Sequence, residues 1–142
     1  NKYALQTMVN KMLTNARKKA KSIESKRKQL PLWNPIRYKL KNTVKLLNKI
    51  IEYGEKNKLS VPKIRRCFTY YLPSLETSVE KYIELSKCST NSREIQSIRK
   101  KAEDSFMLFH YNFEKELETL LSPTMMDLDA EISVFRQEIN SP

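Results

Sequence analysis

Glycine constrains the fold of this chain most strongly, because the chain has almost none. Gly54 is the single glycine in 142 residues, and six prolines accompany it. A β-sheet protein needs turns at short intervals, and many of those turns depend on glycine. The composition therefore argues strongly against an all-β fold. With 39% hydrophobic residues, the chain can form a core as one domain spanning residues 1–142.

Apolar residues recur at steps of three and four positions along most of the chain, which is the pattern of amphipathic α-helices. The pattern predicts helices over five stretches, at about 1–29, 35–57, 60–87, 92–121 and 128–139. Long helices with short connections predict an all-α fold, an elongated antiparallel bundle of four or five helices. We expect a basic N-terminal helix over 1–29 and a bundle core over 35–140, with the apolar stripe from Ile95 to Leu120 at its centre.

Prolines and their neighbours mark the expected helix boundaries. Asn34 is expected to cap the second helix, with Pro35 in its first turn. Pro73 is expected to kink or interrupt the third helix and Pro123 to end the fourth, because proline cannot donate a backbone hydrogen bond. Trp33, between two prolines, is expected to pack over the core.

Charge is distributed unevenly along the chain. The segment Asn1–Tyr71 holds 19 basic and 3 acidic residues, a net of +16, whereas Leu72–Pro142 holds 8 basic and 13 acidic residues, a net of −5. The two parts sum to the formal net charge of +11. A dense positive face attracts polyanions such as lipid headgroups, nucleic acid or acidic proteins.

Cys67 and Cys88 form no CxxC pair, so free thiols are expected.

The basic residues carry the strongest functional signal in the sequence. They are densest near the end of the first helix, where we assign an anionic-surface site to Arg17, Lys18, Lys19, Lys21, Lys26, Arg27 and Lys28. Nucleic-acid binding would favour interleaved aromatic residues or a recognisable motif, and neither is found. An anionic membrane surface requires only the charge. We therefore predict a membrane surface first and nucleic acid second.

Few residues suggest chemistry. Asp127, Asp129 and Glu131 are candidates for a metal site, because carboxylate oxygens suit magnesium and calcium. On a helix, however, Asp127 and Glu131 share one face while Asp129 points away, and acids near a helix start are favoured by the helix dipole alone. His110 is the one candidate for acid–base work near neutral pH. Because no nucleophile–base pair or glycine-rich phosphate loop is found, we predict no catalytic residue and no cofactor.

Three segments, CFTYYLPS (Cys67–Ser74), EKYIELS (Glu80–Ser86) and DLDAEISV (Asp127–Val134), resemble in order and separation the bromochloroindolyl phosphate hydrolysis family, the XpaC-like proteins of bacteria. The resemblance covers roughly residues 36–140, whereas 1–29 resembles the family poorly. The residues that match the family pattern are Tyr70, Tyr71, Leu72, Pro73, Tyr82, Leu85, Asp127, Asp129 and Glu131.

The resemblance implies a membrane-anchoring region followed by a cytoplasmic helical domain, and a link to TelA-like toxic-anion resistance proteins. It also implies, through the family name alone, a phosphate ester hydrolase as the alternative if the chain is an enzyme. We therefore expect a non-enzymatic adaptor at the cytoplasmic face of the membrane, anchored by a segment outside this chain. Its basic half would face anionic lipid and its C-terminal half a protein, such as a TelA-like one. The sequence sets no oligomeric state.

Overall fold

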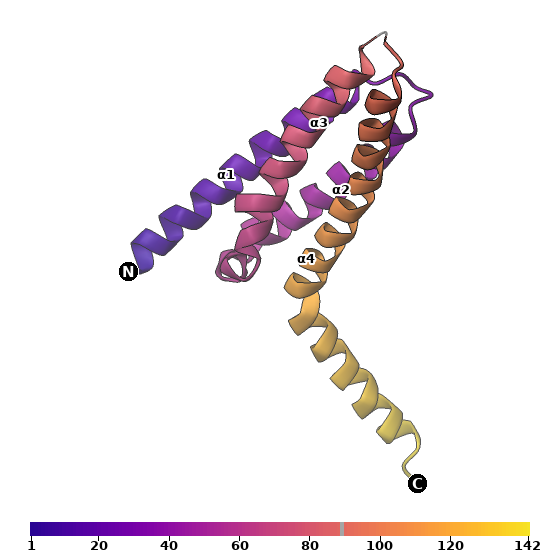
Figure 1. Cartoon of the computed structure of the whole chain (residues 1–142). Coiled ribbons are helices and arrows are strands. Elements are labelled where there is room, and N and C mark those ends of the chain that lie inside the picture. Colours follow the sequence, from indigo (N-terminus) through magenta and orange to yellow (C-terminus); the bar gives the residue numbers. More distant parts are fainter. Residues whose placement is uncertain (89) are drawn as a thin grey trace.

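A computed structural model of the chain describes residues 1–88 and 90–142, and it is helical almost throughout (Figure 1). The α-helices are α1 (Lys2–Arg27), α2 (Pro35–Lys56), α3 (Leu72–Ser86) and α4 (Arg93–Ile139), and between α2 and α3 lie a 3-10 helix, η1 (Lys58–Ile64), and a π-helix, η2 (Cys67–Tyr71). No strand occurs among the described residues. The predicted all-α fold is confirmed. Ser89, in the predicted turn between α3 and α4, lies outside the described residues.

The helices run alternately up and down along one long axis (Figure 1). Helix α1 packs against α2 and α3, and α4 packs against α2 and α3 in turn. The C-terminal part of α4 leaves the bundle and projects away from it (Figure 1). The elongated antiparallel bundle expected from the helix lengths is therefore confirmed.

The core of the bundle is built from one apolar stripe on each helix. The buried apolar residues include Leu13, Ala16, Ala20 and Ile23 of α1, Leu40, Leu47, Ile50 and Ile51 of α2, Leu72, Leu75, Val79 and Tyr82 of α3, and Phe106, Phe113 and Leu120 of α4. In α4, the predicted stripe is buried only from Phe106 to Leu120, and Ile98 near its start is exposed. The stripe therefore lies at the centre of the bundle over its second half alone.

The single glycine serves close packing and not a turn. Gly54 lies inside α2, which ends at Lys56 and is followed by the capping residue Asn57. A Cβ atom at Gly54 would lie 3.0 Å from Leu13 Cδ2 and 3.1 Å from Val61 Cγ2. Such separations are shorter than ordinary van der Waals contacts. Helix α1 and η1 thus approach α2 where glycine leaves room for them.

The prediction that Pro123 ends the fourth helix is wrong. Pro123 lies inside α4, which continues to Ile139 as one element of 47 residues. The helix changes direction in this region (Figure 1). A proline in a helix removes one backbone hydrogen bond and displaces the preceding turn, but it does not prevent the helix from resuming. Pro123 is exposed, so water can solvate the carbonyl group that loses its partner.

Pro73 is accommodated in a different way. It lies in the first turn of α3, where its missing N–H group is tolerated. Immediately before it, the Leu72 N–H group donates to the carbonyl of Cys67, five residues earlier, which defines the π-helix η2. The widened turn carries the chain from η1 into α3 without an interruption, as π-bulges do in other helices.

The prediction that Trp33 covers the core is also wrong, since Trp33 is 75% exposed. Leu30, three residues earlier, is buried at that position instead. The neighbouring Asn34 turns inward, because its side chain caps α2 by accepting a hydrogen bond from the Ile36 N–H group at 2.8 Å. An inward Asn34 leaves the adjacent Trp33 side chain on the outside of the loop.

Candidate functional site

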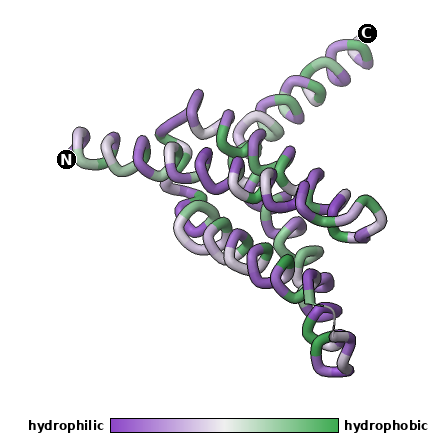
Figure 2. Tube along the Cα trace, turned by 90° about the horizontal axis from the view of Figure 1, so that it is seen from above, coloured by the Kyte–Doolittle hydropathy of each residue, from purple (hydrophilic) through white to green (hydrophobic). Residues whose placement is uncertain are grey.

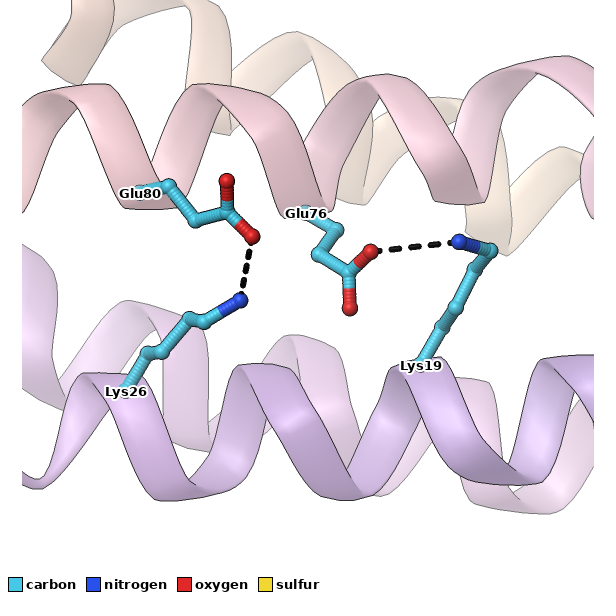
Figure 3. Close-up of polar contacts among 4 residues, drawn as sticks. All are labelled: Lys19, Lys26, Glu76 and Glu80. Atoms are coloured by element: carbon cyan, nitrogen blue, oxygen red, sulfur yellow. Dashed lines mark hydrogen bonds and ion pairs between the residues drawn. The ribbon is translucent and has the colours of Figure 1, made fainter.

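Four of the seven basic residues assigned to the anionic-surface site are paired with carboxylates of the protein itself. Arg17 binds Glu55 of α2, and Arg27 binds Glu24 one turn earlier in α1. Lys19 and Lys26 bind two carboxylates of α3, Glu76 at 3.1 Å and Glu80 (Figure 3). These four cations hold α1 against its neighbours or against its own preceding turn, so they contribute little to a surface that could bind a separate anion.

The pKa values of the paired groups agree with this structural role. The hydrogen bond from Arg17 holds the pKa of Glu55 below its ordinary value, and the hydrogen bond to Glu55 raises the pKa of Arg17. The hydrogen bond from Arg27 likewise lowers the pKa of Glu24. Arg27 is only 6% exposed. A buried cation must keep its partner, because an uncompensated buried charge is strongly destabilising.

The remaining three residues of the assigned site are exposed, and no ion pair is found for them among the described residues. They are Lys18, Lys21 and Lys28, and Lys11 continues the same line toward the start of the helix. Residues seven and three positions apart share one face of an α-helix, so these lysines form one stripe on the outer side of α1. This stripe remains available to a partner.

Helix α2 adds two lysines that we did not assign from the sequence. Lys41 and Lys45 line a groove between α1 and α2 together with Lys21 and Lys28, and the cavity has a volume of about 470 Å³. The only carboxylate that lines the groove is Glu24, which Arg27 already occupies. We call the set Lys11, Lys18, Lys21, Lys28, Lys41 and Lys45 the basic face.

Which lysines belong to the basic face depends on which of them form ion pairs with carboxylates of the protein, and the sequence does not reveal that. Lys19 and Lys21 are two residues apart and look alike in the sequence. In the fold, Lys19 faces α3, where its ammonium group donates a hydrogen bond to the Glu76 carboxylate. Lys21 instead faces the outer groove beside Lys41 and Lys45. The assignment of Lys41 and Lys45 would have required knowledge that α2 lies beside the second half of α1.

The family-pattern residue Tyr82 lies at a buried polar junction of three helices. The Asn34 amide donates to the Tyr82 hydroxyl at 3.1 Å, and that hydroxyl donates to Glu103 of α4 at 2.9 Å. Burial raises the pKa of Tyr82. The ring also packs edge-on against Phe106. Tyr82 therefore connects the N-terminal cap of α2 to α3 and α4, which is a structural role.

The other family-pattern residues do not converge on one site. Leu72 is buried, Pro73 and Leu85 are half-buried and Tyr70 is exposed. The Arg66 guanidinium lies over the half-buried Tyr71 ring, with its Cζ atom 5.5 Å from the centre of the ring. These positions serve the packing around η2 and α3, while the family-pattern acids lie on the far part of α4.

The three acids considered as weak candidates for metal ligands, Asp127, Asp129 and Glu131, all lie exposed on α4 beyond Pro123. Within the described ranges, no group of three or more His, Cys, Asp or Glu side chains is placed to hold a metal ion. The expectation that these acids lie near a helix start, where the helix dipole favours them, is wrong, because α4 begins at Arg93 and they lie in its interior. They give the end of α4 a negative charge.

His110 meets a hydroxyl group that the sequence did not connect with it. Its Nδ1 atom lies 2.8 Å from the hydroxyl of Thr43 in α2, and its Nε2 atom lies 3.4 Å from Glu114. The Thr43 hydroxyl also lies 3.1 Å from the Lys39 carbonyl, and Thr43 is buried. Burial and the nearby Lys39 charge lower the pKa of His110. A buried, hydrogen-bonded threonine cannot reach a substrate, so the pair fixes α4 to α2.

Cys67, one of the two expected free thiols, is buried at the start of η2, and Cys88 is exposed. Burial raises the pKa of the Cys67 thiol, and the charge of Glu116 adds to the effect. A thiol held in its protonated form is a poor nucleophile. Cys67 therefore acts as a small apolar residue of the core.

The fold, the basic face and the C-terminal part of α4 together define the class of protein: an all-α bundle with a cationic outer face and a projecting C-terminal helix. Comparison with protein families gives a match over residues 3–135 to the family described as 5-bromo-4-chloroindolyl phosphate hydrolysis protein. The chain belongs to this family. The match includes α1, so the expectation that residues 1–29 resemble the family poorly is wrong.

Comparisons with curated proteins and with solved structures found no significant match. Within the part of the chain that the structure describes, no helix has the length and apolar character needed to cross a bilayer.

Proposed function

We propose that this domain is a non-enzymatic interaction module that binds an anionic membrane surface through the basic face and a protein through the C-terminal part of α4. The single observation that carries the first half is the set of lysines around the groove between α1 and α2. Lys21, Lys28, Lys41 and Lys45 converge there, and no ion pair is found for any of them among the described residues. Like charges held this close together repel one another, and an anionic partner relieves that repulsion.

The shape of the basic face favours a membrane over nucleic acid. The lysines extend along the outer side of two neighbouring helices, a broad surface that can contact several headgroups at once. Each Lys or Arg near anionic lipid contributes about 1 kcal/mol to binding. Single-stranded nucleic acid is usually held by aromatic rings that stack on bases. No aromatic residue lines the groove between α1 and α2.

The experiment offers the purified domain vesicles of phosphatidylglycerol and phosphatidylcholine, pure phosphatidylcholine vesicles, duplex DNA and single-stranded RNA. All anionic ligands are supplied at equal phosphate concentration and physiological salt. We expect binding to the anionic vesicles and little binding to the neutral ones. Binding to nucleic acid in preference to the anionic vesicles would overturn the membrane proposal.

A matched pair of variants locates the binding surface. The triple substitution Lys21→Gln, Lys28→Gln and Lys45→Gln should weaken vesicle binding by about 100-fold, because three contributions of about 1 kcal/mol are lost. The control triple Lys58→Gln, Lys81→Gln and Lys101→Gln removes the same charge from exposed positions elsewhere and should weaken binding far less. Equal losses for both triples would show that net charge alone drives binding, and the basic face would not be the site.

Hydrolysis of a phosphate ester is the second candidate, because the family description names 5-bromo-4-chloroindolyl phosphate. We expect the purified domain to release no product from that compound above the level of a buffer control. Release that disappears in His110→Ala or Asp127→Asn, with the helical content unchanged, would establish an enzyme and overturn the non-enzymatic proposal.

The membrane location at the cytoplasmic face and a TelA-like protein partner are parts of the same proposal, and both derive from the family resemblance. The C-terminal part of α4 supports a protein contact, because it projects from the bundle with its apolar side chains exposed. A pull-down with this chain as bait from detergent-solubilised bacterial membranes tests the TelA-like partner. Recovery of no such protein would remove it from the proposal.

A further inference from the structure

The last part of α4, Leu121–Ile139, is an amphipathic helix with no covering partner among the described residues, and we call it the arm. Its large apolar residues beyond Pro123 are exposed, with exposed fractions from 42% for Ile132 to 69% for Met126, and Leu121 before Pro123 is half-buried. Figure 2 shows apolar and polar residues alternating along the arm where it leaves the bundle. A soluble helix seldom leaves such a stripe open to water, and a contiguous apolar face marks an interaction surface.

The spacing of the stripe identifies the geometry of the partner. Its members are Leu121, Met125, Leu128, Ile132, Phe135 and Ile139, at alternating steps of four and three. This is the heptad spacing of a coiled coil, in which the partner is another helix that winds around the first. In heptad terms Met125, Ile132 and Ile139 occupy position a, while Leu121, Leu128 and Phe135 occupy position d. In parallel coiled coils, isoleucine at position a with leucine at position d favours a dimer of two helices.

Charges beside the stripe select an identical helix in the parallel orientation. In a parallel pair, position g of one helix meets position e of the next heptad in the other, which places Glu131 opposite Arg136 twice. In an antiparallel pair with full overlap, Asp129 would instead meet Asp129 and Glu131 would meet Glu131. Like charges in those places oppose that arrangement. The parallel pair thus gains two favourable contacts and avoids two repulsive ones.

We propose that the arm is a homodimerisation element, which pairs with the arm of a second copy of this chain as a short parallel coiled coil. The inference rests on the protein-binding half of the proposed function, but it assigns a second copy of this chain to the arm in place of a TelA-like protein. It is independent of the lipid-binding half. The arm spans under three heptads, so the dimer is weak, with a dissociation constant on the order of micromolar. Dimerisation would also place two basic faces on one particle and so strengthen vesicle binding.

Sedimentation equilibrium over a range of protein concentrations tests the proposal. The wild-type domain should change from monomer to dimer as concentration rises. Ile132→Lys, which places a charge in the stripe, should weaken the dimer about tenfold or more. Ala130→Lys places the same charge on the opposite side of the arm and should leave the dimer unchanged. A wild-type domain that stays monomeric at 100-fold above micromolar concentration, or equal losses in the two variants, would overturn the proposal.

Charge exchange tests the parallel orientation. Glu131→Arg alone and Arg136→Glu alone should each weaken the dimer, because each places like charges opposite one another. The double variant should restore it, since the opposite charges face one another again. In the antiparallel arrangement Glu131→Arg would replace one repulsive pair by another and change little, and that result would overturn the parallel coiled coil.

The two halves of the account fail separately in these experiments. A wild-type domain that stays monomeric and still binds anionic vesicles would overturn the coiled coil and leave the basic face intact. A monomeric domain whose arm binds a TelA-like protein, with the binding lost in Ile132→Lys, would overturn the homodimer in favour of a different partner.

Discussion

Helix α4 contains two regions that look alike in sequence and differ in the structure. Between Phe106 and Leu120 its apolar stripe is buried against α2 and α3, and Phe113 is 0% exposed. Beyond Pro123 the stripe continues at the same helical spacing, yet Phe135 is 63% exposed. Apolar periodicity therefore specifies the face of a helix that will be covered, but it does not specify whether the covering partner belongs to the same chain.

The largest expected effect compares one phenylalanine from each region. Phe113→Ala should lower the free energy of unfolding by about 3–5 kcal/mol, because it removes a fully buried ring and leaves a cavity. Phe135→Ala should change it by less than about 0.5 kcal/mol, because its ring is exposed in the monomer. Urea unfolding at a concentration too low for dimerisation measures both. Comparable losses would show that the arm is packed within the monomer.

A smaller effect concerns the polar junction that joins the buried part of α4 to α2 and α3. Tyr82→Phe keeps the ring against Phe106 but removes the hydroxyl between Asn34 and Glu103. It should lower the free energy of unfolding by about 1–3 kcal/mol, since the buried Asn34 amide and the half-buried Glu103 carboxylate lose their partner. Tyr70→Phe removes an exposed hydroxyl and is the matched control. An equal effect of the two substitutions would contradict the role assigned to Tyr82.

The smallest expected effect is a pH dependence of the free energy of unfolding, which arises from His110 in the buried part of α4. The pKa of His110 in the folded protein lies below its ordinary value of 6.5, because burial and Lys39 disfavour the imidazolium. The unfolded chain thus binds the proton first as pH falls. The stability difference between wild type and His110→Gln should be constant above pH 6.5 and shift against the wild type as pH falls below it. Thermal unfolding of both proteins from pH 8 to pH 5 measures it, and a shift in the opposite direction would contradict the assigned environment.

Most of the fold could be predicted from the sequence because helices are encoded locally. The N-terminus of α2 illustrates this. Asn34 is a favoured capping residue and Pro35 a favoured residue of the first turn, so the two predict a helix start, and α2 begins there. The end of α4 illustrates the limit. Pro123 is a local signal to stop, but its cost is one lost hydrogen bond, and the strong helical pattern on both sides outweighs it.

The candidate site was predictable in kind but not in membership. The excess of positive charge is a property of composition and is visible without a structure. Which lysine meets a carboxylate depends on contacts between residues far apart in the chain, such as Lys19 with Glu76, 57 positions later. For the same reason Lys41 and Lys45 were left out of the assigned site, because they join the basic face only where α2 folds back along α1.

Hydrogen–deuterium exchange at several protein concentrations tests the contrast between the two parts of α4 most directly. Backbone amides between Phe106 and Leu120 should exchange slowly at every concentration, because the bundle protects them. Amides of the arm should exchange rapidly at the lowest concentration and slow as concentration rises and arms pair. Arm amides that are protected equally at all concentrations would show that the arm is covered within one chain, and the account would be wrong.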